Sequence, residues 1–345
     1  MHFLLVKSEH DLGQNVVFFD VGHGDCLLLL DRSSQGLLVD CGSWRPHSHL
    51  DVPKTIEKIL SKKNNCGFVV SHYHFDHYSL FHWLEKPNRL FSKIYVPYIP
   101  SRGPGFDAAR AIMTYMSAAT LVDYSYYRIL PEIFSKAERS IIPCKRGDFI
   151  REANQNLKVL WPDITNPLLG SDEIRRIAKS IKQSIEPFLT DWDFRIPHSE
   201  GEDLTIRFFE YLEYLRTRKL SEEKKRLMQR ILGEIEGQFK KLANIFSLVA
   251  SSYRKRHSRF LFLADVDDQI LSNLKIPGKR EFNCIKAAHH GTSFGNALIN
   301  LSTEFLLISR NKKEFPVKNI HDGYLFDIHY KMVLSTDFLH HCLIL

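Results

Sequence analysis

The sequence lacks the long apolar segment that a membrane-spanning helix needs. Such a helix requires about 20 consecutive apolar residues, whereas the aliphatic run Leu27–Leu30 is only four residues long. The N-terminus, MHFLLVKSEH, has neither a basic region nor an apolar stretch of signal-peptide length. We therefore expect a cytoplasmic protein with no membrane partner.

Closely spaced cysteines are also missing. No two of the six cysteines have the CxxC spacing that structural zinc sites use. Because the chain carries no export signal, we predict reduced thiols in the core. We see no Cys–His pairing that would indicate a cysteine nucleophile.

The composition excludes a disordered or fibrous protein. Hydrophobic residues make up 44% and charged residues 25% of the 345 residues, and no fixed-period repeat is present. The net charge of +7 is compatible with a polyanionic partner, but it is modest for this length and does not by itself indicate one.

Short apolar runs bounded by Gly and Asp predict strands, and they alternate with helical patterns. We expect strands over residues 15–21, 26–31, 36–41, 67–71, 93–98 and 157–161, and helices over 52–61 and 106–119. This alternation predicts an α/β fold with helices packed outside the sheet.

Residues from about 168 to 243 have a different pattern, with apolar residues at helical spacing and charges of both signs between them. We predict three helices, over residues 174–185 (ended by Pro187), 204–215 and 227–239. We interpret them as a helical insertion in a single domain of residues 1–345. Its apolar faces would be core faces; a docking surface for a protein partner is the alternative.

Strand character returns after the insertion. Apolar runs over residues 245–253 and 258–264 predict two strands, and the basic cluster Arg254–His257 lies between them. We expect this cluster at a hairpin tip. The second strand is about 20 Å long at about 3.3 Å per residue, so the cluster would lie far from residue 265.

The strongest chemical signal is the segment Ser71–His77, SHYHFDH. On an extended backbone, His72 and His74 point the same way and can face one ion. Asp76 and His77 follow where the chain turns into a helix, and they can face a second ion. Burying four such side chains without partners would cost several kcal/mol, a cost that a metal removes. The pattern therefore predicts a metal site.

This HxHxDH pattern resembles the signature of the metallo-β-lactamase superfamily, which implies an αββα sandwich. Three further elements are similar to that superfamily and follow in its order. LLVDCG contains Asp40, which resembles an aspartate that supports the ligand loop. FLFLAD ends at Asp265, which resembles the carboxylate that bridges two metals, and AAHHGT contains His289 and His290 at the last ligand position.

A narrower resemblance is to the hydrolase domain of bacterial competence proteins (ComEC-like). It rests on FFDVGHGDCLLL, LLVDCG, VVSHYHFDH, LKVLWP, NIFSLV, FLFLAD and IKAAHHGT in this order, over about residues 14–165 and 244–310. The resemblance implies phosphodiester hydrolysis, usually of DNA. The helical insertion lies outside it.

The sequence departs from this family at three positions. His74 stands where the competence domains often have Asp. No histidine matches the widespread third motif, since His198 and His257 lie in unrelated contexts. Near the C-terminus, where the family tends to have His-Pro, this sequence has Phe315-Pro316. The first metal would then have only His72, His74 and Asp265 from the protein.

The expected mechanism uses two divalent ions, zinc or manganese, that share Asp265 and activate a water for attack on phosphorus. Asp76, His289 and His290 are the candidate catalytic residues. One of the two histidines would be a ligand, and the other would contact phosphate or protonate the leaving group.

The remaining candidates are supporting residues. Thr292 and Ser293 either contact phosphate or cap a helix. We interpret Asp20 and Asp25 as structural residues beside the ligands, and Lys286 as a solvated side chain. His23 in DVGHGD is taken as a turn residue, with a place beside the metals as the alternative.

Three functions remain open from the sequence. The first is a metal-dependent nuclease acting on DNA, with nucleic acid as partner. The second is a hydrolase of a small phosphodiester such as a nucleotide messenger. The third is a scaffold subunit with a degenerate metal site. The missing third-motif histidine and the large insertion are the observations that favour it.

Overall fold

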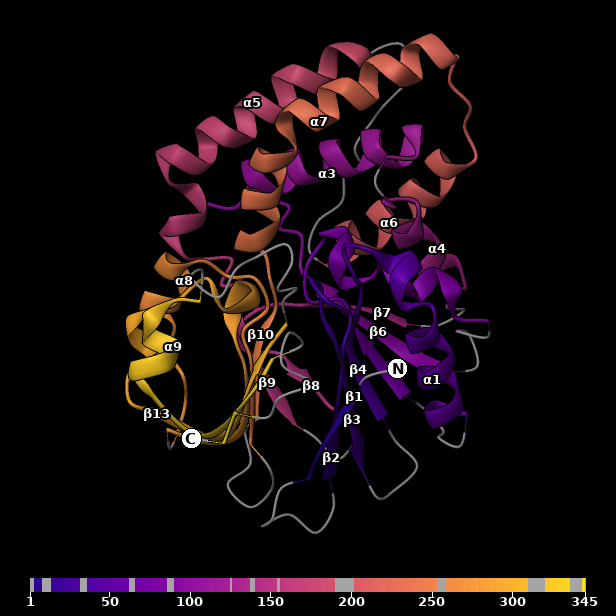
Figure 1. The fold of residues 1–345 in the computed structure, drawn as a ribbon. Helices are drawn as coiled ribbons and strands as arrows, with labels where there is room; N and C mark the ends of the chain where they lie inside the picture. Colours follow the sequence, from indigo (N-terminus) through magenta and orange to yellow (C-terminus); the bar gives the residue numbers. More distant parts are fainter. Residues whose placement is uncertain are drawn as a thin grey trace.

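The computed structural model describes residues 3–7, 14–31, 36–61, 66–85, 90–124, 126–136, 140–153, 156–189, 202–252, 259–278, 280–309, 320–335 and 343–344. It is a mixed α/β structure with two sheets and helices around them (Figure 1). The α/β prediction is therefore confirmed. No helix among these residues combines the length and the apolar character needed to cross a membrane.

The first sheet has seven strands in sequence order. They are β1 (Phe3–Lys7), β2 (Gln14–Phe19), β3 (Cys26–Asp31), β4 (Gly36–Cys41), β5 (Cys66–Val69), β6 (Phe91–Pro97) and β7 (Ser140–Cys144). Strands β1 to β4 pair antiparallel, and β4 to β7 pair parallel. The parallel half needs crossovers, of which α1 (Asp51–Leu60) is the first.

The second sheet has eight strands, also in sequence order. They are β8 (Phe149–Ile150), β9 (Leu157–Trp161), β10 (Val249–Ser252), β11 (Phe260–Phe262), β12 (Glu281–Lys286), β13 (Leu301–Ile308), β14 (Ile328–Ser335) and β15 (Leu343–Ile344). Strands β11 to β14 are parallel. Each sheet therefore has parallel strands whose carboxyl ends can carry a site.

The two sheets bury their facing surfaces against each other. One apolar cluster joins Phe18, Leu29 and Val39 of the first sheet to Val159 and Phe262 of the second. Successive side chains of a strand point to opposite faces, so the other side chains belong to a second cluster shared with helices, among them α1, α8 (Asp268–Asn273) and α9 (Asp322–Phe326). The helices thus cover the outer faces of the sheets.

A layer of longer helices lies at one end of the sheets (Figure 1). It contains α3 (Phe106–Val122), α5 (Asp172–Leu189), α6 (Glu202–Arg216) and α7 (Glu222–Ile245), beside the shorter α4 (Ile129–Lys136). Helix α3 is buried along almost its whole length and packs against α5, α6 and α7. The predicted apolar residues of the insertion, such as Ile181, Phe208 and Phe239, lie in the core.

Two predicted boundaries in this layer are wrong. Helix α5 continues through Pro187 to Leu189, because a proline in the last turn removes only one backbone hydrogen bond. Helix α7 extends to Ile245, so β10 begins at Val249 and not at residue 245. The basic cluster Arg254–His257 lies outside the described residues.

The thiol prediction is confirmed where the structure describes it. Cys26, Cys41, Cys66, Cys144 and Cys284 are free and buried. Cys342 lies outside the described residues.

Three loops meet backbone to backbone at the top of the first sheet. Gly24 follows β2, Gly42 follows β4 and Asp76 lies in the loop after β5. A Cβ on Gly42 would lie 2.2 Å from the carbonyl oxygen of Asp76, and one on Gly24 would lie 2.6 Å from the carbonyl oxygen of Gly42. The amide of Asp25 donates to the Asp76 carbonyl at 3.2 Å. Only glycine permits this approach.

We expect Gly42→Ala to destabilise the protein by about 1–3 kcal/mol or more, because the new methyl group must displace backbone. Gly237→Ala is the matched control: it lies in α7 with nothing within 4 Å of a new Cβ. It should stabilise the protein by about 0.5–1 kcal/mol. Urea unfolding measures both; equal effects would contradict the close approach.

Candidate metal centre

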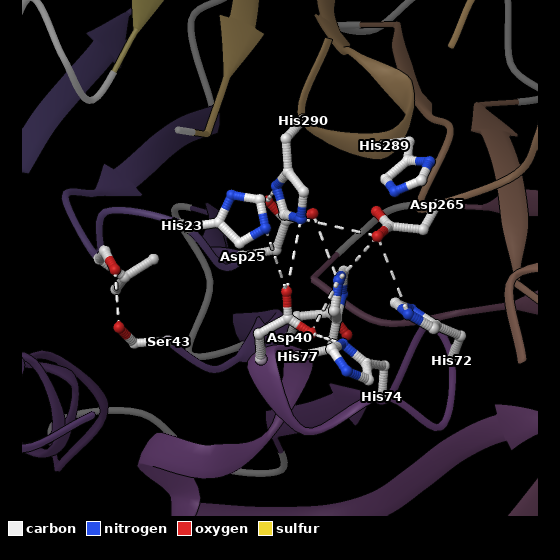
Figure 2. Close-up of polar contacts among 12 residues, drawn as sticks. His23, Asp25, Asp40, Ser43, His72, His74, His77, Asp265, His289 and His290 are labelled. Atoms are coloured by element: carbon white, nitrogen blue, oxygen red, sulfur yellow. Dashed lines mark hydrogen bonds and ion pairs between the residues drawn. The ribbon is translucent and has the colours of Figure 1, made fainter. Parts of the chain in front are cut away.

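The predicted ligands gather where the carboxyl ends of parallel strands from both sheets meet (Figure 2). Strand β4 leads to Asp40, β5 to the segment His72–His77, β11 to Asp265, and β12 to His289 and His290. The amide of His289 donates to the carbonyl of Ala264 at 2.9 Å, which ties the last two loops together. Residues far apart in sequence therefore form one cluster.

The backbone at this cluster is strained. Asp40, Ala264, His289 and His290 have φ values of 57°, 45°, 45° and 54°, in the left-handed region that residues with a Cβ seldom adopt. Each such residue costs roughly 1–3 kcal/mol. Strain of this kind concentrates at functional sites, where the surrounding structure holds a side chain in a required place.

Asp265 lies at the centre of the cluster. Its Oδ2 is 3.9 Å from Nε2 of His72, 3.6 Å from Nε2 of His77 and 3.6 Å from Nε2 of His290. Oδ2 of Asp76 lies 3.4 Å from Nε2 of His290. All five side chains are nearly or fully buried. This arrangement agrees with a carboxylate shared between two ions.

These residues fit a divalent ion. Nε2 of His72, His77 and His290 and Oδ1 of Asp265 are buried and make no hydrogen bond. The separations of 3.4–3.9 Å exceed hydrogen-bond length. Two ligands of one tetrahedral ion, each about 2.0–2.1 Å from it, lie roughly 3.3 Å apart. Imidazole nitrogens and carboxylate oxygens that lie at this spacing without hydrogen bonds are suitable ligand atoms for a zinc or manganese ion.

The charges in the cluster favour a cation. Burial alone would raise the pKa of Asp265, but His290 and His77 hold that pKa well below its usual value. Burial would lower the pKa of His77, yet Asp40, Asp265 and Asp76 raise it well above the usual value. The carboxylates therefore stay ionised and draw positive charge toward themselves. Burial keeps the pKa of His72 well below its usual value, which leaves a neutral imidazole.

His74 has a different environment from His72. The two rings lie 6.2 Å apart and nearly parallel, at 19°, as the alternation of an extended chain predicts. However, Nδ1 of His74 contacts Oδ1 of Asp76, while its Nε2 is buried and unpaired. His74 is absent from the groups of donors, among the described residues, that lie within 4.8 Å of one another. Its place is beside the cluster formed by His72, His77 and His290.

Asp40 contacts the segment that carries the candidate ligands. Its carboxylate accepts from the backbone amide of Ser71 at 2.7 Å and from the Ser71 hydroxyl at 2.6 Å, and its Oδ2 lies 2.8 Å from Nδ1 of His77. This contact fixes the ring so that Nε2 of His77 points toward Asp265. Partners of this kind set the tautomer and orientation of a ligating histidine.

We expect Asp40→Asn to weaken metal binding about 10–100-fold, because the neutral amide no longer orients His77 as a carboxylate does. Asp20→Asn is the control. Asp20 accepts from the amide of Gly22 at 3.2 Å, which an asparagine oxygen can also do. Calorimetric titration with Zn²⁺ gives both affinities; an unchanged affinity in Asp40→Asn would rule out the supporting role.

The structure distinguishes His289 from His290. His290 is 3% exposed and points into the cluster, whereas His289 is partly exposed beside Asp265 (Figure 2). Only His290 belongs to the groups of close donors. His290 is therefore the candidate ligand, and His289 is left for contact with a substrate.

The two hydroxyl residues that follow do not share one environment. Thr292 is exposed, but its hydroxyl donates to the carbonyl of His289 at 2.6 Å. Ser293 is buried, at 7% exposure. Thr292 thus stabilises the histidine turn.

The prediction of a solvated Lys286 is wrong. Its side chain is 6% exposed, and Nζ lies 2.9 Å from Oδ1 of Asp25. Lys286 and Cys284 lie on the same face of β12, which is turned toward the other sheet. Lys286 and Asp25 both line a cavity between the sheets. Asp25 also lies 3.9 Å from Nδ1 of His77 and of His290. This ion pair therefore lies beside the candidate metal ligands His77 and His290.

His23, for which the sequence left this place open, and two residues that the sequence did not assign to the site also lie there. His23 is in ring contact with His290, with centroids 4.0 Å apart. Trp44, 37% exposed, lies 5.6 Å from the ring of His74, and Nζ of Lys240 in α7 lies 4.3 Å from the Trp44 ring. The helical insertion thus contributes a cation to the rim of the site. No sequence pattern connects these residues, except that His23 lies between two glycines.

No protein-family model matches the chain, and no curated protein matches it in sequence. His198, His257 and Phe315-Pro316 lie outside the described residues.

Proposed function

We propose that the protein is a metal-dependent phosphodiesterase of the metallo-β-lactamase fold, related to the ComEC-like hydrolase domains, and that it cleaves DNA. The observation that carries the proposal is the buried convergence of His72, His77 and His290 on Asp265, with Asp76 beside them. Such a set of unpaired nitrogen and oxygen donors has no structural use without a cation.

The arrangement of the sheets supports the fold assignment. Two facing sheets with helices on their outer surfaces agree with an αββα sandwich. The ligands also follow the strand ends in the order that the superfamily requires, from His72 to Asp265 to His290. The helices α5 to α7 form the insertion, whose use as a protein docking surface stays a prediction.

The chemistry follows from the donors. When bound, two divalent ions would supply a nucleophilic water at neutral pH and neutralise charge on the phosphate oxygens. Asp265 and Asp76 provide the negative charge that holds cations there, and Asp40 and Ser71 keep His77 oriented. His289, at the open side of Asp265, is placed to hydrogen-bond a phosphate oxygen or to protonate the leaving group.

The rim of the site fits a nucleotide. Trp44 offers a partly exposed aromatic ring close to the ligand loop, and aromatic rings bind unpaired bases by stacking. Lys240 adds a positive charge near the same ring, as phosphate binding needs. The net charge of +7 agrees with a nucleic-acid partner. A small nucleotide phosphodiester would use the same groups and is the second candidate.

The test is cleavage of labelled single- and double-stranded DNA, and of cyclic dinucleotides, with Mn²⁺ or Zn²⁺. The wild type is compared with Asp76→Ala/His77→Ala. Cleavage of DNA by the wild type alone supports the proposal. Cleavage of the cyclic dinucleotides alone selects the small-substrate candidate. A folded wild type that holds no metal and cleaves nothing would mean a scaffold with a degenerate site.

A further inference from the structure

We propose that His23 is a ligand of the metal ion held by Asp76 and His290, so that the loop between β2 and β3 is a fourth ligand-bearing loop. This inference rests on the proposed metal centre, but not on the substrate or on catalysis. It assigns a direct metal contact to a histidine that the sequence pattern favours as a turn residue.

The distances place His23 among the donors. Nε2 of His23 lies 4.0 Å from Oδ2 of Asp76, and Nε2 of His290 lies 3.4 Å from the same oxygen. The rings of His23 and His290 have centroids 4.0 Å apart at 42°, which is too tilted for stacking (Figure 2). One ligand atom from each of the three residues lies within 4.8 Å of the others. A single ion between them would be within reach of all three after small side-chain shifts.

The backbone holds His23 in this place. The carbonyl of His23 accepts from the amide of Trp44 at 2.7 Å, and the amide of Asp25 donates to the carbonyl of Asp76 at 3.2 Å. Gly24 and Gly42 bring the loops into direct backbone contact. The loop that carries His23 is therefore anchored to the loop that carries Asp76. A ligand needs such a fixed position, whereas a turn residue has no reason to point its ring at Asp76 and His290.

The ligand count gives a reason for a further histidine. Among the described residues, the groups of close donors contain no histidine from between His77 and Asp265, where the third motif of the superfamily lies. With His23, the ion beside Asp76 has His23, Asp76 and His290, and Oδ2 of Asp265 lies 3.6 Å from Nε2 of His290. Four protein donors complete a tetrahedral set. His23 would thus supply an imidazole in place of the third-motif histidine.

The test is metal binding by His23→Ala and by His23→Asn, which keeps a turn-forming residue. The protein is stripped with EDTA and titrated with Zn²⁺ in a calorimeter. Loss of a residue that only hydrogen-bonds a metal ligand lowers metal affinity about 10–100-fold. We therefore expect the affinity for one zinc equivalent to fall by about 100-fold or more in both variants. X-ray absorption of the zinc-loaded protein should show fewer imidazole scatterers per zinc than in the wild type.

His82→Ala is the matched control, because His82 is 51% exposed and pairs with Glu132 at the surface. It should leave both measurements unchanged. Wild-type affinity and imidazole number in folded His23→Asn, with only a lower unfolding midpoint, would make His23 a turn residue and overturn the inference. A wild type that binds two zinc ions but cleaves no phosphodiester would instead contradict the proposed function and leave the ligand assignment to be decided by the same titration.

Discussion

Asp265→Asn is expected to lower metal-dependent cleavage by about 10³-fold or more. Oδ2 of Asp265 lies within 4 Å of the imidazoles of His72, His77 and His290, so its charge acts on the whole cluster. Metal stabilisation of a transition state is worth several kcal/mol, and each factor of ten corresponds to about 1.4 kcal/mol. Replacing the carboxylate by a neutral amide should therefore remove at least one ion together with its contribution.

Asp267→Asn provides the control for this change. Asp267 lies two residues further along the same loop, and its side chain caps α8 by accepting from the amide of Ile270 at 2.9 Å. Asparagine caps a helix as well as aspartate does. The variant should keep wild-type cleavage and metal content. Cleavage by Asp265→Asn within tenfold of the wild type would show that Asp265 does not bridge the ions.

Lys286→Met is expected to destabilise the metal-free protein by about 3–5 kcal/mol, because it leaves Asp25 as a buried carboxylate without its partner. Both side chains are 6% exposed, and the pair is 2.9 Å apart. Burial alone would raise the pKa of Asp25, but Lys286, followed by His77 and His290, lowers it below its usual value. Urea unfolding in EDTA measures the loss.

The pH dependence of this pair has a defined sign. A carboxyl group whose folded-state pKa is lowered contributes stability above the unfolded value of 3.8, and that stability is lost as the pH falls through the folded value. The difference in the free energy of unfolding between the wild type and Lys286→Met should therefore be largest at neutral pH and decrease in acid. The double variant Asp25→Asn/Lys286→Met should recover much of the loss. A single variant as stable as the wild type would mean that the pair contributes nothing.

Local patterns predicted much of the site. The HxHxDH segment predicted that its own polar side chains would gather, because alternation in an extended chain sets which side chains share a face. The resemblance to the metallo-β-lactamase superfamily implied that Asp40, Asp265 and the pair His289 and His290 would join them. The structure places these residues together, although His74 lies closer to Asp76 than to Asp265.

What the sequence could not predict depends on contacts between distant segments. Lys286 was taken as solvated because a lone lysine on a strand usually is. Its partner Asp25 is far away in the sequence and immediately precedes β3 of the other sheet. His23 is similar: the glycines beside it indicated a turn, but not which loops that turn would contact. The rim residue Lys240 comes from the insertion, for which no pattern gave an orientation.

The most direct test of the metal centre is anomalous diffraction from crystals soaked in Mn²⁺ or Zn²⁺. We expect two anomalous peaks about 3.5–4 Å apart, on either side of Asp265, with His72 and His77 near one and His290 near the other. Peaks only at the protein surface, with the Asp265 cluster left without an ion, would contradict a metal centre at this place.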